Sequence, residues 1–167
     1  MNDNVLKDKA TLLKSAIKSE IDGYNFYDLL AKQITNVEAR KRLENLRNDE
    51  SRHRSVLTGW YKKIIGGEVG ELPEKGISPL EAAFDKGNLK KFNNEIEYIN
   101  LAMKAELEAT RFYKEAAQKM DDAEFKKILK EFSEEENGHY EILMAEREAI
   151  SGNYFWFSAD GTSPMED

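Results

Sequence analysis

The sequence contains no cysteine and only three prolines among its 167 residues. Without cysteine the chain can form no disulfide, no thiolate zinc site, no rubredoxin-type iron site and no thiol nucleophile. It also has no apolar run near the roughly 18 residues that a membrane span needs, and its first residues lack the basic-then-apolar order of a signal peptide. We therefore expect a cytoplasmic protein that has no membrane partner.

Acidic side chains outnumber basic ones. The 25 lysines and arginines face 32 aspartates and glutamates, which gives a net charge of −7 and an isoelectric point near 5.1. Because binding to phosphates needs a basic face, nucleic acid is disfavoured as the main partner. The length fits one domain with a substantial core, which we place at residues 1–152, before a C-terminal tail at 153–167.

The prolines are Pro73, Pro79 and Pro164, so two long stretches have none. Such stretches, with 34% charged residues overall, favour long helices over a sheet. The second predicted helix starts at Thr35, where Thr35–Glu38 has the pattern of a capping box, and the fourth is capped by Asp121 or Asp122. The four helices are expected over about residues 8–34, 35–65, 91–120 and 121–151.

The connection between the second and third helices is long, at residues 66–90. It holds five glycines and two of the prolines, and Ser78–Glu81 predicts a short helix within it. The joints inside the two pairs of helices are short, so each pair forms an antiparallel hairpin, at 8–65 and 91–151. The predicted fold is all-α, a ferritin-like four-helix bundle with one long crossover.

Each predicted helix has a glutamate where its apolar period requires a core side chain. Such breaks in a local rule are expected at functional sites. The predicted inward positions are Leu13, Ile17, Glu20, Tyr24, Tyr27 and Ala31; Leu43, Leu46, Glu50, His53, Leu57 and Trp60; Ile99, Met103, Glu106, Thr110, Tyr113 and Ala117; and Leu129, Phe132, Glu136, His139 and Leu143.

The two hairpins repeat one another. A shift of 86 residues aligns 19–57 with 105–143 and gives ten identities in 39 positions, including both Glu-x-x-His motifs. The chain is therefore predicted to be two copies of one helical hairpin, related by an approximate two-fold axis through the glutamates.

Four glutamates and two histidines form a ligand set for two metal ions. A glutamate and a histidine three residues apart share a helix face, and carboxylates with imidazoles suit iron or manganese. We expect Glu50 and Glu136 to bridge the metals, Glu20 and Glu106 to be terminal ligands, and the histidines to bind one metal each. The alternative is that these carboxyls are buried without metal, protonated or paired. The ligand set is Glu20, Glu50, His53, Glu106, Glu136 and His139.

Other residues near this set have two interpretations each. Tyr27 and Tyr113 either donate hydrogen bonds to ligand carboxylates or are ordinary core. Gly23 and Gly138 either leave space for a small oxidant or allow close packing of helices. Trp60 and Met103 are expected in the core.

The motifs resemble the diiron domain of the rubrerythrin family, within the ferritin-like superfamily. The similarity covers about residues 10–150 and is carried by Glu20 with Tyr27, Glu50–His53, Glu106 with Tyr113, and Glu136–His139. It implies an oxidoreductase that reduces hydrogen peroxide, or dioxygen, to water. The cofactor implied is two iron ions per chain, with an oxo or hydroxo bridge when oxidised, and with manganese as an alternative in either position.

The resemblance also has two departures. Many members append a rubredoxin-like domain, which needs cysteines that this chain lacks, so electrons are expected from a separate donor such as a rubredoxin-like protein. The family's further glutamate, three residues after the third-helix ligand, is Ala109 here. Glu108 is a candidate extra ligand, although in a regular helix it points away from Glu106.

Two other functions stay open: a ferritin-type protein that oxidises and stores iron, and a metal-free interaction bundle. The aromatic run Tyr154–Phe157 is expected to pack on the bundle or on a second copy of the chain, with a homodimer favoured.

Overall fold

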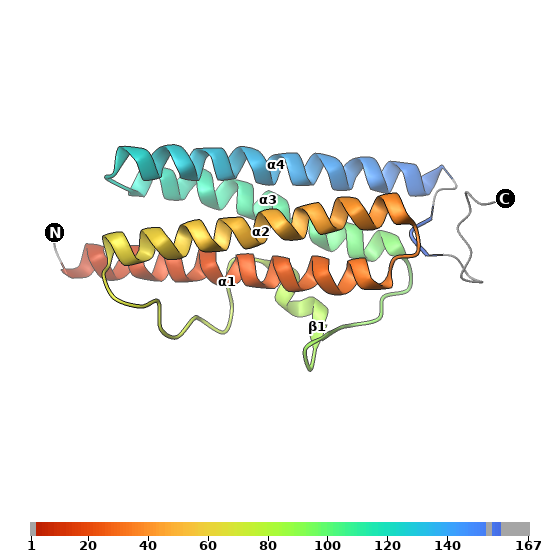
Figure 1. Cartoon of the computed structure of the whole chain (residues 1–167), viewed down its shortest axis with the longest axis horizontal. Coiled ribbons are helices and arrows are strands. Elements are labelled where there is room, and N and C mark those ends of the chain that lie inside the picture. The colour runs from red at the N-terminus through yellow and green to blue at the C-terminus, as the bar shows by residue number, and fades with distance from the viewer. Residues whose placement is uncertain (1–2, 153–154, 158–167) are drawn as a thin grey trace.

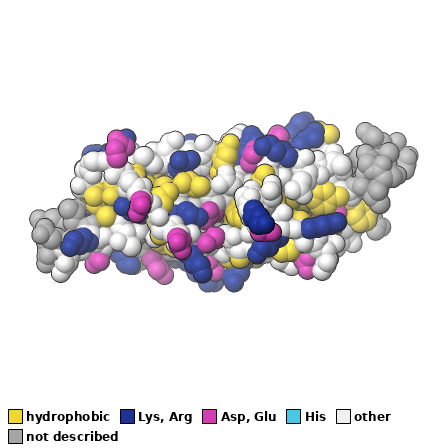
Figure 2. Space-filling view, turned by 90° about the horizontal axis from the view of Figure 1, so that it is seen from below, with side chains coloured by type: hydrophobic (Ala, Val, Ile, Leu, Met, Phe, Trp, Pro, Cys, Tyr) yellow, Lys and Arg dark blue, Asp and Glu magenta, His cyan; other side chains and the backbone are white. Residues whose placement is uncertain are grey.

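The computed structural model describes residues 3–152 and 155–157. Its four long helices, α1 (Asp3–Gln33), α2 (Val37–Ile64), α3 (Glu95–Lys119) and α4 (Ala123–Ser151), lie lengthwise beside one another (Figure 1). The predicted all-α four-helix bundle is therefore confirmed. None of the helices within the described residues is long and apolar enough to cross a membrane. On the face in Figure 2, basic side chains are mixed with acidic ones.

The start of α2 corrects one prediction. Its N-cap is Asn36, whose side chain accepts a hydrogen bond from the backbone N–H of Ala39 at 2.9 Å. Thr35 does not cap the helix, because its backbone N–H and its hydroxyl both donate to the carbonyl of Trp156, at 3.0 and 3.1 Å. A contact with a residue far along the chain thus moves the cap by one position.

Two other helix starts also differ from expectation. α3 begins at Glu95, because Asn94 caps it by accepting from the N–H of Glu97 at 3.2 Å. The N–H of Phe92, in the segment expected to be helical, donates instead to the hydroxyl of Tyr98 at 3.3 Å. α1 begins at Asp3, five residues before the expected start, since no proline or glycine interrupts that stretch. α4 is capped by Asp122 and ends before Gly152, as expected.

The crossover returns the chain to the end of the bundle where α2 began, so that α3 runs parallel to α2 (Figure 1). Within it a 3₁₀ helix, Pro79–Ala83, is capped by Ser78, whose side chain accepts from the N–H of Leu80 at 3.1 Å. The sequence did not indicate the small hairpin that follows, β1 (Phe84–Asp85) paired antiparallel with β2 (Asn88–Leu89). Its turn residues Lys86 and Gly87 both have positive φ, which glycine adopts without strain.

Apolar side chains form two clusters, one toward each end of the bundle. One includes Leu13, Trp60 and Phe125, and the other includes Leu30, Leu46 and Ile99. The four glutamates and two histidines are buried in the same bundle, in neither apolar cluster. Trp60 and Met103 are core residues, as predicted.

One inward position was predicted wrongly, and its equivalent in α3 is only half-buried. Tyr24 is 36% exposed, and Gly23 occupies the buried position between Glu20 and Tyr27. The equivalent pair in α3 behaves similarly: Ala109 lines a cavity beside the glutamates, whereas the half-buried Thr110 donates its hydroxyl to a backbone carbonyl. A step of three or four residues fits the helical period equally well, so the apolar ring of Tyr24 misled the assignment.

The aromatic run packs on the same chain where the structure describes it. Trp156 is fully buried in the apolar cluster that contains Leu30, and its indole N–H donates to Glu146 at 3.0 Å. Phe157 contacts the ring of Tyr98, whereas Phe155 is 41% exposed. Tyr154 lies outside the described residues.

Candidate metal centre

The six predicted ligands come together in the middle of the bundle, one from each of α1 and α3 and two from each of α2 and α4. Their side chains form two groups, and within each group one potential ligand atom per residue lies within 4.8 Å of all the others. Each of the six is at most 5% exposed. One group is Glu20, Glu50, His53 and Glu136, and the other is Glu50, Glu106, Glu136 and His139.

The two histidines turn the same ring atom toward the carboxylates. The Nδ1 atom of His53 lies 2.9 Å from Glu136 and 3.5 Å from Glu20. The Nδ1 atom of His139 lies 3.0 Å from Glu136 and 3.7 Å from Glu106. Both rings thus turn their Nδ1 atom toward the same cluster of carboxylates. Glu50 and Glu136 are the two members that both groups share.

Several of these buried atoms make no hydrogen bond of normal geometry among the described residues, and their close contacts are to one another. Because a buried polar atom without a partner is costly, this grouping needs an explanation. A divalent metal ion fits the donor set, since carboxylate oxygens and imidazole nitrogens are the ligands that iron and manganese bind. The atoms are Oε2 of Glu20, Nδ1 of His53, both carboxylate oxygens of Glu136 and Nδ1 of His139.

Two tyrosines tie the hairpins together beside this centre. The hydroxyl of Tyr27 in α1 donates to Glu106 in α3, and the hydroxyl of Tyr113 in α3 donates to Glu20 in α1. Burial, and then the nearby carboxylates, raise the pKa of both tyrosines well above the usual value, so both hydroxyls stay protonated donors. Of the two interpretations of the tyrosines, the structure agrees with the first, in which both hydroxyls donate hydrogen bonds to the clustered carboxylates.

The outer nitrogen of each histidine is held by an acid of the opposite hairpin. The Nε2 atom of His53 lies 2.8 Å from Glu135, and the Nε2 atom of His139 lies 3.0 Å from Asp49. These contacts lower the pKa of both acids. Such an acid fixes the ring orientation and makes the imidazole a better metal ligand.

Asp49 and Glu135 were not predicted as site residues. A signal for them was present, because an acid directly precedes each Glu-x-x-His motif and the two acids are 86 residues apart.

The metal-free cluster holds protons. Burial lowers the pKa of both histidines, but the surrounding carboxylates outweigh burial and raise it to about 11 for His53 and about 12 for His139. Burial and the charge of Glu136 raise the pKa of Glu106 to about 8, and burial raises that of Glu50 as well. Burial acts in the same direction on Glu136, but its two histidine neighbours outweigh it and lower the pKa. Metal ions would replace these protons.

A cavity of about 20 Å³ adjoins the carboxylates, between α1, α3 and the crossover. That volume has room for one water-sized molecule. Gly23 and Ala109 form part of its wall, and Ile77 and Leu80 of the crossover line it as well. Glu108 is half-buried and joins neither ligand group among the described residues, and α3 is a regular helix at this point.

Gly23 gives the carboxyl group of Glu50 its space. A Cβ atom at this position would lie 3.2 Å from both Cδ and Oε1 of Glu50, closer than ordinary packing allows. Gly138, in contrast, has no heavy atom outside its own helix backbone and its two chain neighbours within 4 Å of such a Cβ in the part of the chain that the structure describes. Close packing therefore does not account for it, and it is not among the residues that line the cavity beside the carboxylates.

Replacing Gly23→Ala should weaken metal binding about tenfold if Glu50 is a ligand, because the new methyl group displaces its carboxylate. The metal-free protein should not lose stability in the same way, since alanine favours a helix over glycine by about 1 kcal/mol. Calorimetric titration with metal and thermal unfolding would measure the two effects. Gly59→Ala is the matched control, since no neighbouring side chain among the described residues lies within 4 Å of its added Cβ. Equal metal affinity in both variants would contradict this account of Gly23.

Known proteins are similar to this chain in sequence or in fold. Among curated proteins, the uncharacterized protein YhjR of Bacillus subtilis (strain 168) is 26% identical over 132 residues, which are 76% of this chain and 78% of YhjR. A solved hypothetical protein from Pyrococcus furiosus is 27% identical, with a TM-score of 0.75 over 86% of this chain and 90% of that one.

The bacterioferritin-related protein of Bacteroides fragilis, described as a dodecameric thioferritin, is 20% identical, with a TM-score of 0.72 over 87% of this chain and 88% of that one. This likeness shows the ferritin-like fold. The model of the rubrerythrin family matches residues 11–147, which span all six clustered side chains. The chain therefore belongs to the rubrerythrin family.

Proposed function

We propose that this protein is a non-haem dinuclear-metal oxidoreductase that reduces hydrogen peroxide to water with electrons from a separate donor protein. The observation that carries the proposal is the pair of buried four-residue groups, each with three carboxylates and one imidazole. Two divalent ions balance the four carboxylates, and iron is the metal that we propose, with manganese as the alternative.

Each ligand has a proposed role. Glu50 and Glu136 belong to both groups, as bridging carboxylates must. Glu20 would complete the half that contains His53, and Glu106 the half that contains His139. We keep Glu108 outside the ligand set because it joins neither group.

Two iron ions would supply the two electrons that reduction of one peroxide consumes. The protein's part is to place and shield the reaction. The hydroxyls of Tyr27 and Tyr113 fix the carboxylates of Glu106 and Glu20 in orientation. Ile77, Leu80 and Ala105 form the apolar part of the wall of the adjoining cavity, beside the hydroxyl-bearing Ser19 and Ser78. The absence of cysteine is the reason for proposing an external electron donor, such as a rubredoxin-like protein.

The test is the oxidation of the fully reduced, iron-loaded protein, followed by its absorption spectrum. We expect rapid oxidation by hydrogen peroxide, complete at one peroxide per two iron ions, and slower oxidation by dioxygen. Protein loaded with redox-inert zinc is the control and should not consume peroxide. Much faster oxidation by dioxygen than by peroxide would contradict the proposal.

The alternative function is ferritin-type oxidation and storage of iron. It takes its support from the dodecameric thioferritin of the same fold. Storage requires a hollow multimer and uptake of many iron ions per chain, whereas the peroxidase proposal needs only two ions and a small assembly, for which we propose a homodimer. Sedimentation mass and the iron content after ferrous loading distinguish the two.

A further inference from the structure

The two hairpins match at the predicted ligands of the candidate centre, but they differ beside these ligands in one charged residue. The shift of 86 residues pairs Glu50 with Glu136 and His53 with His139, and it also pairs the outer acids Asp49 and Glu135. The residue directly before each histidine differs, however. Arg52 of α2 precedes His53, whereas Gly138 of α4 precedes His139. The structure therefore has one guanidinium where its own symmetry would provide two or none.

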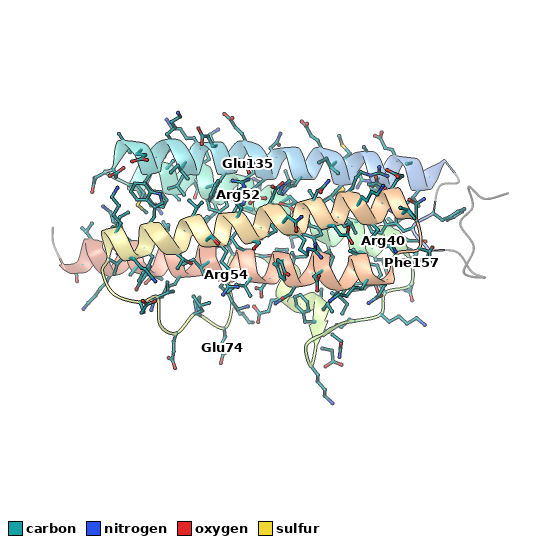
Figure 3. The ribbon with its side chains drawn as sticks, in the orientation of Figure 1. Arg40, Arg52, Arg54, Glu74, Glu135 and Phe157 are labelled. Carbon is teal, nitrogen blue, oxygen red and sulfur yellow. The ribbon has the colours of Figure 1, made fainter. Side chains whose placement is uncertain are left out.

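Arg52 lies on the His53 side of the centre. Its guanidinium forms an ion pair with Glu135 and lies 3.5 Å from the Nε2 atom of His53 (Figure 3). It also lies 6.0 Å from the ring of Phe132, which stacks on the imidazole of His53 at 4.0 Å. The position equivalent to Phe132 in the other hairpin is Leu46, so this stack also has no symmetric copy.

The contact with the other outer acid is weaker. Arg52 lies 3.5 Å from one oxygen of Asp49, and the other oxygen of Asp49 is the one that contacts His139, at 3.0 Å. In the first half, by contrast, the same oxygen of Glu135 serves both Arg52 and His53. Arg52 thus neutralises the acid behind His53 more than the acid behind His139.

This difference affects the two histidines as metal ligands. A carboxylate behind an imidazole strengthens that imidazole as a donor, and the effect falls when the carboxylate is shared with a guanidinium. The positive charge of Arg52 beside His53 also repels a cation on that side. Both effects weaken the His53 half relative to the His139 half.

We propose that Arg52 makes the two metal positions unequal. The half with Glu106 and His139 binds a divalent ion first and more tightly, and the half with Glu20 and His53 is filled last and emptied first. Arg52 is a positioning residue here, since it binds no metal itself and acts through Glu135, through His53 and through its charge. The inference rests on the proposed dinuclear centre.

Two substitutions, one in each hairpin, should each reduce the asymmetry between the two metal positions. Arg52→Ala removes the guanidinium that has no symmetric copy. Gly138→Arg adds the missing guanidinium, at a helix position where no neighbouring side chain of the described residues lies within 4 Å of an added Cβ. Arg54→Ala is the matched control, because it removes the same charge from an exposed position two residues further along α2 (Figure 3).

The experiment is an anaerobic titration with Co²⁺ at low salt, followed by absorption and calorimetry, with thermal unfolding of each metal-free variant to confirm folding. The wild type and Arg54→Ala should bind two ions in steps about tenfold or more apart in affinity. Arg52→Ala should make the two affinities more similar by strengthening the second binding step. Gly138→Arg should do the same by weakening the first. Added salt should narrow the gap, because the side chain of Arg52 is 47% exposed.

Single histidine variants identify the steps. His139→Ala should abolish the tight step, and His53→Ala the weak one. Three results would each overturn the proposal about Arg52 without contradicting the proposed metal centre. They are the reverse assignment of the two histidines to the binding steps, two steps of equal affinity in the wild type, and an unchanged difference in affinity between the steps in folded Arg52→Ala. Failure of the folded wild type to bind cobalt would overturn the proposed centre, and this inference with it.

Discussion

Raising the pH from about 6 to about 9 should destabilise the metal-free protein and strengthen metal binding by the same chain. The reason lies in the protons of the buried cluster. The folded state raises the pKa of His53 to about 11 and that of His139 to about 12, whereas an unfolded histidine releases its proton near pH 6.5.

The sign follows from the number of bound protons. A raised pKa in the folded state means that stability is fully present below the unfolded pKa and is lost as the pH rises toward the folded pKa. Above about pH 6.5 the folded state keeps protons that the unfolded state has released, at about 1.4 kcal/mol per pH unit for each proton. Glu106, whose pKa is raised to about 8, acts in the same direction between the unfolded value of 4.5 and 8.

Metal reverses this dependence, because the ions must displace the same protons and displacement becomes easier as the pH rises. Melting temperatures of chelator-treated and metal-loaded protein across this range would test the expectation. In the double variant His53→Gln/His139→Gln the fall in metal-free stability should largely disappear. The account would be contradicted if the melting temperatures of the metal-free and the metal-loaded wild type changed with pH in the same way.

Replacing Trp156→Ala should cost about 3–5 kcal/mol of unfolding free energy. The side chain is fully buried, and its removal leaves a cavity in the apolar cluster that contains Leu30. The loss also takes a hydrogen bond from the buried carboxylate of Glu146, which would keep its ion pair with Arg42.

Urea unfolding measures this effect. Trp156→Phe should recover part of the loss, since it restores packing without the indole N–H. Phe155→Ala is the control one residue away and should change the free energy by no more than about 0.5 kcal/mol, because its side chain is 41% exposed. A similarly small effect of Trp156→Ala would contradict the view that this residue belongs to the core.

The helical period explains why so much of the centre could be predicted. Residues three and four apart share a helix face, so Glu50 and His53 had to point the same way, as did Glu136 and His139. The repeat then required both pairs to lie at one depth in the bundle. The buried cluster of six side chains follows from these two facts and from the apolar residues around them.

The remaining features depend on contacts that the period does not specify. Asp49 and Glu135 lie at the edge of the inward face, where a charged residue ordinarily contacts solvent. The choice of Gly23 over Tyr24 depends on the space that Glu50 needs. The cap at Asn36 depends on the carbonyl of Trp156, 120 residues later in the chain.

The central claim is that the chain holds two metal ions between Glu50 and Glu136. The most direct measurement is elemental analysis of protein purified without added metal, alongside Glu50→Ala/Glu136→Ala and the exposed control pair Glu38→Ala/Glu134→Ala. The account predicts about two iron or manganese ions per chain in the wild type and the control, and their loss from the Glu50/Glu136 variant. No bound metal in the wild type, with no gain on anaerobic ferrous loading, would contradict it.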